Sequence, residues 1–227
     1  MKAFCLRSSA FGLQPKTLMY SVKEIFYSIQ GEGYYSGRPA VFCRFSGCNL
    51  WSGREEDRDK ALCKFCDTDF VGTDGIDGGL YKTASLLAKK ISQHWPQANE
   101  RRFLVCTGGE PLLQMDAALI AALHEENLEI AVETNGTIAA PAGIDWICVS
   151  PKAGAQLLTR SGQELKLVFP QEGAEPEKYA MLNFRYFFIQ PLDSPDLEKN
   201  TRLALDYVLS HPQWRLSLQI QKILNIK

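Results

Sequence analysis

Short apolar runs alternate with amphipathic segments along most of this chain, and this alternation limits the fold more than any other feature. The runs are rich in Val, Ile and Phe, as strands buried on both faces are. They lie at residues 40–45, 103–106, 129–133, 146–149, 165–169 and 186–190. Helical patterns cover 83–94, 116–127 and 200–210, with Thr83 and Asp116 as suitable N-caps. The alternation predicts parallel βα units.

Five of the six predicted strands run directly into polar segments. These segments begin at Ser46, Thr107, Thr134, Ser150 and Gln190. Because ligands bind at the carboxyl ends of strands in parallel α/β sheets and barrels, we expect the five strand ends to form one pocket. Six strands favour a partial, open parallel β/α barrel, and periodicity alone leaves an open doubly wound sheet as the alternative.

Three of the seven cysteines, Cys48, Cys63 and Cys66, form a candidate set of ligands for an iron–sulfur cluster. Three thiolates can hold a cluster and leave its fourth iron open to a small molecule. The other cysteines stand singly, three of them in apolar runs where a thiol behaves as a buried hydrophobe, and we expect them in the core rather than as ligands: Cys5, Cys43, Cys106 and Cys148. The alternative, a structural zinc site, needs a fourth ligand that no residue supplies at an obvious finger spacing.

The composition indicates one domain that acts on a small molecule. The 227 residues are 45% hydrophobic and 22% charged, and we expect the domain to span residues 19–227. Residues 1–18 lack a sustained apolar period and predict a disordered extension or a true start at Met19. A net charge of -1 offers no basic field for nucleic acid, and no apolar run approaches the ~20 residues that span a bilayer. The odd number of cysteines argues against disulfides and for the cytoplasm.

Five motifs in one order resemble a known family. They are a C-x14-C-x2-C arrangement followed by Asp67 and Thr68, and the segments 29–33 (IQGEG), 108–111 (GGEP), 133–136 (ETNG) and 150–152 (SPK). Together they resemble the 7-carboxy-7-deazaguanine synthases of the radical S-adenosylmethionine superfamily, from about Tyr20 to the C-terminus. Most of that superfamily has C-x3-C-x2-C, and the longer first spacing resembles one branch of the synthases.

The resemblance implies a [4Fe–4S] cluster, S-adenosylmethionine and Mg²⁺ as cofactors. The three cysteines would bind three irons, and the amino and carboxylate groups of S-adenosylmethionine would chelate the fourth. Gly109 allows the backbone close to a ligand, the resemblance places the methionine amino group there, and we expect Glu110 to orient this loop. The Thr68 hydroxyl suits Mg²⁺, a role that the resemblance assigns to it. Further implied contacts to S-adenosylmethionine are Cys66, Asp67, Thr68, Ser150, Pro151, Lys152, Gln190, Pro191, Leu192 and Asp193.

Substrate recognition can be argued from shape and charge. A pterin presents a guanidine-like edge of N–H donors, and Glu32 is a good candidate to accept a bidentate pair from it. Arg44 is able to fork onto a substrate carboxylate. A strand-like run at 215–220 would return the chain end to the pocket, and the resemblance adds Ile29, Gln30, Gly31, Thr107 and the terminal carboxylate of Lys227 as substrate contacts. Gln221 departs from the family, which usually has a His there, and cannot become cationic.

The reaction that the resemblance implies is a ring contraction by a carbon–nitrogen lyase. The reduced cluster would donate an electron to S-adenosylmethionine, which is regenerated, and a 5′-deoxyadenosyl radical would take hydrogen from C6 of 6-carboxy-5,6,7,8-tetrahydropterin. Loss of ammonia would give 7-carboxy-7-deazaguanine, on the route to queuosine. We predict no catalytic side chain, because the cofactor carries the radical chemistry and no histidine lies in a motif.

The partners implied by the resemblance are a reductase such as flavodoxin as electron donor and a second copy of the chain in a homodimer. No direct nucleic-acid or membrane partner is expected. The alternative enzyme class is an activase that places a radical on a partner protein. Such activases often carry extra cysteine clusters, and the loop at residues 49–62 contains no cysteine.

Overall fold

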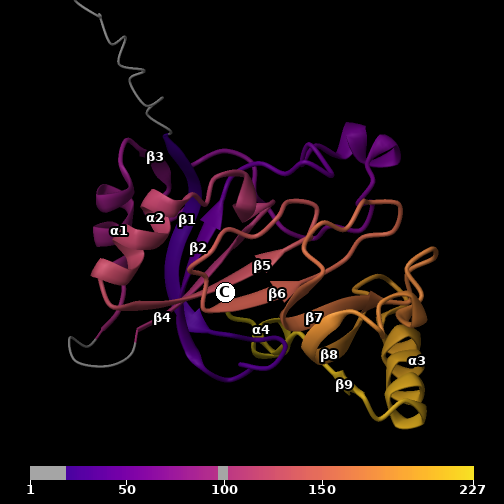
Figure 1. Ribbon diagram of the computed structural model, residues 1–227. Helices are drawn as coiled ribbons and strands as arrows, with labels where there is room; N and C mark the ends of the chain where they lie inside the picture. The colour runs from indigo at the N-terminus through magenta and orange to yellow at the C-terminus, as the bar shows by residue number, and fades with distance from the viewer. Residues whose placement is uncertain (1–18, 97–101) are drawn as a thin grey trace, which may run out of the picture.

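The computed structural model describes residues 19–96 and 102–227, which contain one nine-stranded sheet (Figure 1). The order across the sheet is β3-β1-β2-β4-β5-β6-β7-β8-β9. The strands are β1 Tyr20–Ile29, β2 Pro39–Phe45, β3 Gly79–Tyr81, β4 Arg102–Gly108, β5 Leu128–Thr134, β6 Trp146–Val149, β7 Ser161–Phe169, β8 Asn183–Pro191 and β9 Trp214–Leu216. The predicted extension at residues 1–18, together with Cys5, lies outside the described residues.

The strands from β2 to β9 in this order are all parallel, whereas β1 is antiparallel to its neighbours β2 and β3. The parallel sheet was predicted from the six apolar runs, and all six are strands. Because β3 and β9 end the strand order, the sheet is open. Because the strands from β2 to β9 are parallel, their carboxyl ends lie at one edge, as expected.

The sheet is wider than the six predicted strands. Its additional strands, β1, β3 and β9, were not among those six because their local sequence signals are weak. In β1 the apolar period is broken by Lys23 and Glu24, and the register with β2 shifts between Val22 and Glu24. β3 and β9 have only three residues each. The predicted strand-like run at 215–220 is wrong beyond Leu216, since the chain there turns into the short helix α4, Ile220–Leu224.

The register decides between a partial barrel and a doubly wound sheet. Val132 of β5 packs with the cluster under the helices α1 (Ala84–Ser92) and α2 (Ala117–Glu125), and Thr134 two residues on pairs with Val149 of β6. Val149 pairs with Leu165 of β7, and both pack in the cluster with Ala204 of α3 (Leu197–Ser210). The helices α1, α2 and α3 thus cover one face of the sheet, whereas a doubly wound sheet has such helices on both. The predicted partial barrel is confirmed. An apolar cluster that includes Phe103 and Trp146, at the starts of β4 and β6, fills part of the inner face and leaves the carboxyl ends of the strands for a site.

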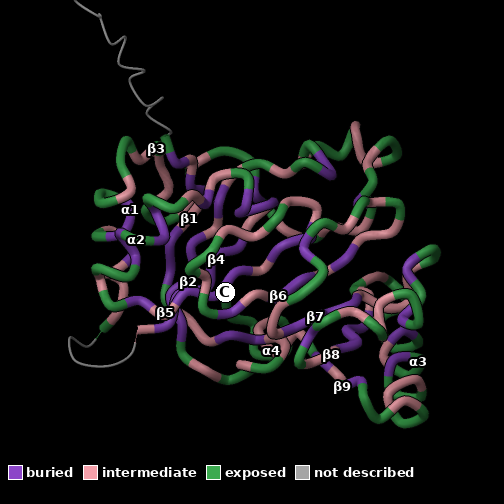
Figure 2. Tube along the Cα trace, in the orientation of Figure 1, coloured by how far each residue is buried: buried purple, intermediate pink, exposed green. Residues whose placement is uncertain are grey.

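The helices α1 Ala84–Ser92 and α2 Ala117–Glu125 begin where their caps predict, and α3 is Leu197–Ser210. Short 3₁₀ turns at Glu55–Lys60, Pro111–Leu113 and Pro176–Lys178 lie in the connecting segments. Thr83 accepts from the Leu86 amide at 3.2 Å, and Asp116 accepts from the Leu119 amide at 2.8 Å. α3 starts three residues earlier than predicted. In Figure 2 the central strands are coloured mostly as buried, and the outer turns of the helices are coloured as exposed.

Residues 19–96 and 102–227 include no helix with the length and apolar character that a membrane span requires.

Candidate active site

A cavity of about 480 Å³ opens at the carboxyl edge of the sheet, on the inner face. It lies within the size range of small-molecule sites, roughly 300–1,000 Å³. The sequence-predicted residues that line it are Ile29, Gln30, Gly31, Glu32, Arg44, Cys48, Cys63, Cys66, Asp67, Thr68, Thr107, Gly109, Ser150, Lys152, Gln190, Pro191, Leu192, Asp193 and Lys227. Pro151 is buried beside them and does not line the cavity. The fold therefore brings together almost all of the residues singled out from the sequence.

The three cysteines of the C-x14-C-x2-C arrangement line the same wall. Cys48 follows β2, and Cys63 and Cys66 follow the 3₁₀ turn of the long loop. A hydrogen bond from Cys63 lowers the pKa of the Cys66 thiol despite burial, whereas the same bond, together with burial, raises that of Cys63. Burial raises the pKa of Cys48. The hydrogen bond thus favours the thiolate form on Cys66, the form that binds metals.

The described residues contain no group of three His, Cys, Asp or Glu side chains placed to hold a single metal ion. The zinc alternative needs four ligands around one ion, and such a set is not present in this part of the chain. In an iron–sulfur cluster the thiolates bind different irons and stand around a larger body. Thiols of Cys48, Cys63 and Cys66 that line one cavity fit that requirement.

The 108–111 loop packs directly against the Cys48 loop. The Gly109 amide donates to the Phe45 carbonyl at 3.3 Å, and the Glu110 amide donates to the Gly47 carbonyl at 2.9 Å. A Cβ at Gly109 would lie 2.0 Å from the Gly47 carbonyl oxygen and 2.9 Å from Cβ of Cys48. Only glycine fits this close approach, which leaves backbone rather than a side chain facing the cavity.

Glu110 does not line the cavity, as expected for a residue that orients the loop. Its fully buried carboxylate accepts from the Leu112 amide at 3.0 Å, the Thr134 hydroxyl at 2.7 Å and the Asn135 amide at 2.8 Å. Burial raises the pKa of Glu110, and these hydrogen bonds oppose the rise. The side chain fastens the end of β4 to the end of β5.

Glu110→Ala is expected to destabilise the apoprotein by at least about 1–3 kcal/mol, because buried donors lose their acceptor. Urea unfolding measures the change. Glu125→Ala, on the exposed side of α2, is the matched control and should remain within about 0.5 kcal/mol of the unmodified protein. Equal stability of the two variants would mean that Glu110 does not hold the loop.

Lys152 extends from the segment after β6 toward the cysteine loop. Its ammonium group donates to the carbonyl and hydroxyl oxygens of Ser150 at 2.7 and 2.8 Å, and lies 6.0 Å from the Phe65 ring centroid. Burial lowers the pKa of Lys152, and the nearby Cys63 and Cys66 oppose this. Lys152 therefore places a positive charge beside the thiols.

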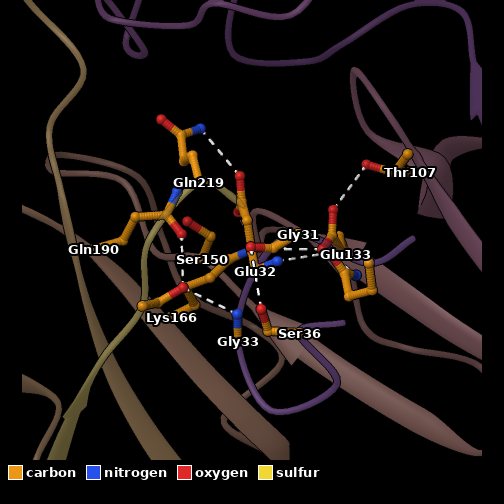
Figure 3. A network of polar contacts seen from close by, with 12 residues as sticks. Gly31, Glu32, Gly33, Ser36, Thr107, Glu133, Ser150, Lys166, Gln190 and Gln219 are labelled. Carbon is orange, nitrogen blue, oxygen red and sulfur yellow. Dashed lines mark hydrogen bonds and ion pairs between the residues drawn. The ribbon is translucent and has the colours of Figure 1, made fainter. Parts of the chain in front are cut away.

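A carboxylate, Glu32, lies at the centre of the polar network in Figure 3. Its Oε2 is 2.5 Å from Lys166 Nζ, and its Oε1 accepts from Gln219 and Gln221 at 3.0 and 2.9 Å. Burial would raise the pKa of Glu32, but the attraction of Lys166 and these hydrogen bonds hold it well below its usual range. The Gln221 amide packs on Gly31, where a Cβ would lie 1.8 Å from Gln221 Oε1. Glu32 is ionised throughout the neutral range.

A second carboxylate, Glu133 at the end of β5, faces the same space. It accepts from Gln30 at 3.1 Å and from Thr107 at 3.1 Å, and lies 3.4 Å from Lys166 Nζ. Glu133 was noticed only as part of a motif, and Lys166 was missed altogether. The available signal was Lys166 itself, a charge inside the apolar run at residues 165–169.

Arg44 and the chain end share one carboxylate at the cavity mouth. Glu24 Oε1 accepts from Arg44 Nε at 3.1 Å, and its Oε2 is 2.6 Å from Lys227 Nζ. The Lys227 carbonyl accepts from the Ser28 hydroxyl at 2.6 Å. The ion pair of Arg44 uses Nε, and Arg44 still lines the cavity. The last residue is held at the site and is not a loose tail.

The C-terminal segment lines the cavity through Gln219, Gln221, Lys222, Ile226 and Lys227. Figure 1 draws the C-terminus in front of the sheet, near α4. Lys222 pairs with Asp193, 2.5 Å away, and with Asp67 next to the cysteine loop. Burial would lower the pKa of Lys222, but the bonds to Asp193 and Asp67 raise it. A charged bridge thus joins the chain end to both flanking loops.

The three histidines of the sequence lie away from this cavity. His94 contacts Asp77, His124 contacts the Gly143 carbonyl, and His211 contacts the Tyr207 carbonyl. None lines the cavity within the described part of the chain.

The fold and the site together define an enzyme of the open β/α-barrel class, with a cysteine-lined cavity at the carboxyl ends of the strands. A 7-carboxy-7-deazaguanine synthase of Caulobacter vibrioides is 63% identical over 209 residues, which cover 92% of this chain and 100% of that protein. The chain belongs to the 7-carboxy-7-deazaguanine synthase family. The predicted family, fold and synthase function are confirmed, and the activase alternative is not supported.

Further comparisons agree. A synthase of the same name from Nitratidesulfovibrio vulgaris is 52% identical over 218 residues and covers 92% of this chain and 100% of its own. The crystal structure of QueE from Escherichia coli is similar with a TM-score of 0.66 and 26% identity, over 88% of this chain and 94% of that one. A scan against protein-family models finds no match.

Proposed function

We propose that this chain converts 6-carboxy-5,6,7,8-tetrahydropterin into 7-carboxy-7-deazaguanine and ammonia as a radical S-adenosylmethionine enzyme of queuosine biosynthesis. The observation that carries this is one cavity with three cysteine thiols on one wall and Glu32, Glu133 and Arg44 around the rest. Cysteine ligands, carboxylate acceptors and a guanidinium are the groups that such a cofactor and such a substrate require.

The residues that would hold the cofactors are Cys48, Cys63 and Cys66 for a [4Fe–4S] cluster, and Gly109, Ser150, Lys152 and the segment 190–193 for S-adenosylmethionine. When bound, these cofactors supply a one-electron reduction that generates an organic radical able to remove a hydrogen atom. The exposed backbone at Gly109 would accept the methionine amino group, and Lys152 lies beside the cluster ligands. Residues of the C-terminal segment line the cavity and would help to keep water from the reacting atoms.

The substrate would lie between Arg44 and the two carboxylates. Arg44 Nε is fixed by Glu24, which leaves the guanidinium terminus for the 6-carboxylate. Glu32 and Glu133 would accept N–H groups from the guanidine-like edge, while Ile29, Gln30, Gly31 and Thr107 complete the wall. The ring contracts with loss of one nitrogen as ammonia, and this balance needs no other reactant.

Three further assignments go with this function. Thr68, at the cavity wall beside Cys66, would place a hydroxyl for Mg²⁺ shared with the substrate carboxylate. Loss of Mg²⁺ stimulation in Thr68→Ala tests this.

A flavodoxin-like reductase in the cytoplasm would supply the electron, and two copies of the chain would form a homodimer. Turnover with reduced flavodoxin and light scattering of the intact protein test these two.

The decisive experiment for the function is anaerobic reconstitution with iron and sulfide, followed by incubation with S-adenosylmethionine, a reductant and candidate pterins. Mass spectrometry should detect 7-carboxy-7-deazaguanine and ammonia from 6-carboxy-5,6,7,8-tetrahydropterin. Absence of this product from a cluster-loaded enzyme would refute the function.

Deletion of Ile226 and Lys227 is expected to weaken substrate binding while the cluster stays intact. The deletion removes the ammonium partner of Glu24 and the carbonyl that Ser28 contacts, so the terminal carboxylate no longer reaches the cavity. Anaerobic calorimetry with the pterin measures the effect, on the order of tenfold or more for a charge-assisted contact. A tag added at Met1 is the control. Unchanged affinity after the deletion would show that the chain end makes no substrate contact.

A further inference from the structure

Lys166 is a buried ammonium group that joins the two carboxylates of the cavity. It comes from the inner face of β7, and its side chain is only 6% exposed. Glu32 reaches it from the loop after β1 and Glu133 from the end of β5, at 2.5 and 3.4 Å (Figure 3). The two carboxylates lie 101 residues apart in sequence, and Lys166 contacts both.

Each carboxylate keeps room for one more donor. A carboxylate has about four acceptor sites. Among the described residues, Glu32 uses three, for Gln219, Gln221 and Lys166, and Glu133 uses three, for Gln30, Thr107 and Lys166. A bidentate contact to Glu32 alone, as expected from the sequence, would therefore displace a present donor. One additional N–H on each carboxylate displaces nothing.

The charges of this cluster do not balance by themselves. Two carboxylates face one ammonium group, which leaves one negative charge at a largely buried place. The Gln221 Oε1 atom beside them is also buried and has no hydrogen-bond partner in the described structure. An unpaired buried charge and an unpaired buried acceptor are both costly. The place is therefore suited to a ligand edge that carries only donors.

We infer that Lys166 is a positioning residue that holds Glu32 and Glu133 at a fixed separation, so that each accepts one N–H from a single ligand. The identity of that ligand, the guanidine-like edge of the tetrahydropterin, rests on the proposed function. A ligand with acceptors in place of these two N–H groups is disfavoured, because its lone pairs would face the free acceptor sites of the two carboxylates and the unpaired Gln221 Oε1.

The pH dependence of binding is the sensitive readout. Lys166 is faced by Glu133 from β5, Glu32 from the loop after β1, Cys148 from β6 and Glu164 from β7, and the ammonium group of Lys152 after β6 repels it. Burial would lower the pKa of Lys166, but the attraction of Glu133 and Glu32 raises it well above its usual range, so the ammonium persists at neutral pH. Without it, burial and mutual repulsion raise the pKa of Glu32, and the carboxylate is lost as the pH falls.

The test compares Lys166→Met with Lys166→Arg, and with Lys89→Met on the exposed side of α1 as control. Pterin binding is measured by anaerobic calorimetry without reductant, between about pH 5 and pH 8. K166M should raise the dissociation constant on the order of 30-fold or more. At each pH the dissociation constant of K166M is divided by that of the unmodified protein, so that titration of the pterin itself cancels. This ratio should grow as the pH falls. K166R should keep this ratio constant with pH, and the cluster absorption and S-adenosylmethionine affinity should not change.

Wild-type affinity of a folded K166M at every pH would overturn the inference. If K166M does not fold, E32Q and the double variant E32Q/K166M replace it, since the double variant buries no unpaired Glu32. The double variant should bind more weakly than E32Q, because Glu133 has also lost its ammonium partner; equal affinities would overturn the inference. Failure of the unmodified protein to bind or convert the pterin would instead refute the proposed function.

Discussion

Cys63→Ala is expected to give a protein that holds no iron–sulfur cluster and forms no 5′-deoxyadenosine. Cys63 contributes one of three thiols on the cavity wall, and Cys66 beside it loses the hydrogen bond that lowers its pKa. Two thiolates do not secure a cluster that also keeps one iron open. Cys48→Ala and Cys66→Ala should have the same effect. Iron and sulfide analysis, visible absorption and chromatographic assay of deoxyadenosine measure it.

The remaining described cysteines serve as internal controls. Cys43 and Cys106 pack in the core under α1 and α2, so Cys43→Ala should retain the full cluster. Cys148 is nearer, since it touches the inner cavity, but burial raises its pKa well above the usual range and keeps it a thiol. Full iron loading in Cys63→Ala would contradict the ligand assignment. Loading that disappears only when Cys148 is also replaced would identify Cys148 as a substitute ligand.

Glu32→Ala is expected to raise the dissociation constant of the pterin steeply. The substitution removes one acceptor and leaves Lys166 with Glu133 as its remaining carboxylate partner among the cavity groups. Truncation of one partner of a buried charge pair costs about 2–5 kcal/mol, on the order of 30- to 4,000-fold in affinity. Calorimetry without reductant gives the value. Glu198→Ala, on an exposed turn of α3, is the control.

Arg44→Ala probes the opposite end of the same ligand. Loss of the guanidinium should weaken a 6-carboxylated pterin by a comparable factor and leave a pterin without the carboxylate unaffected. Cofactor affinity should remain the same in both variants. Normal binding of the carboxylated pterin by Glu32→Ala and Arg44→Ala would place the substrate outside this part of the cavity.

The sequence by itself determined the parts of this protein that depend on neighbouring residues. Apolar runs predicted the six central parallel strands, and the Thr83 and Asp116 caps fixed two helix starts. The polar residues after each strand predicted the cavity, because the ends of parallel strands share one edge. Close spacing also made Cys63 and Cys66 recognisable. These patterns are local, so no knowledge of strand neighbours was needed.

Only the tertiary structure decided which distant residues meet. Lys166 contacts Glu32 and Glu133 because β5, β6 and β7 are in register on the inner face, and register follows from how the crossovers pack. The placement of α1, α2 and α3 on one face has the same cause. Glu24 holds both Arg44 and Lys227, 203 residues further along, because the final turn crosses the cavity. Such long-range pairs leave no local period in the sequence, since their geometry exists only when the sheet has formed.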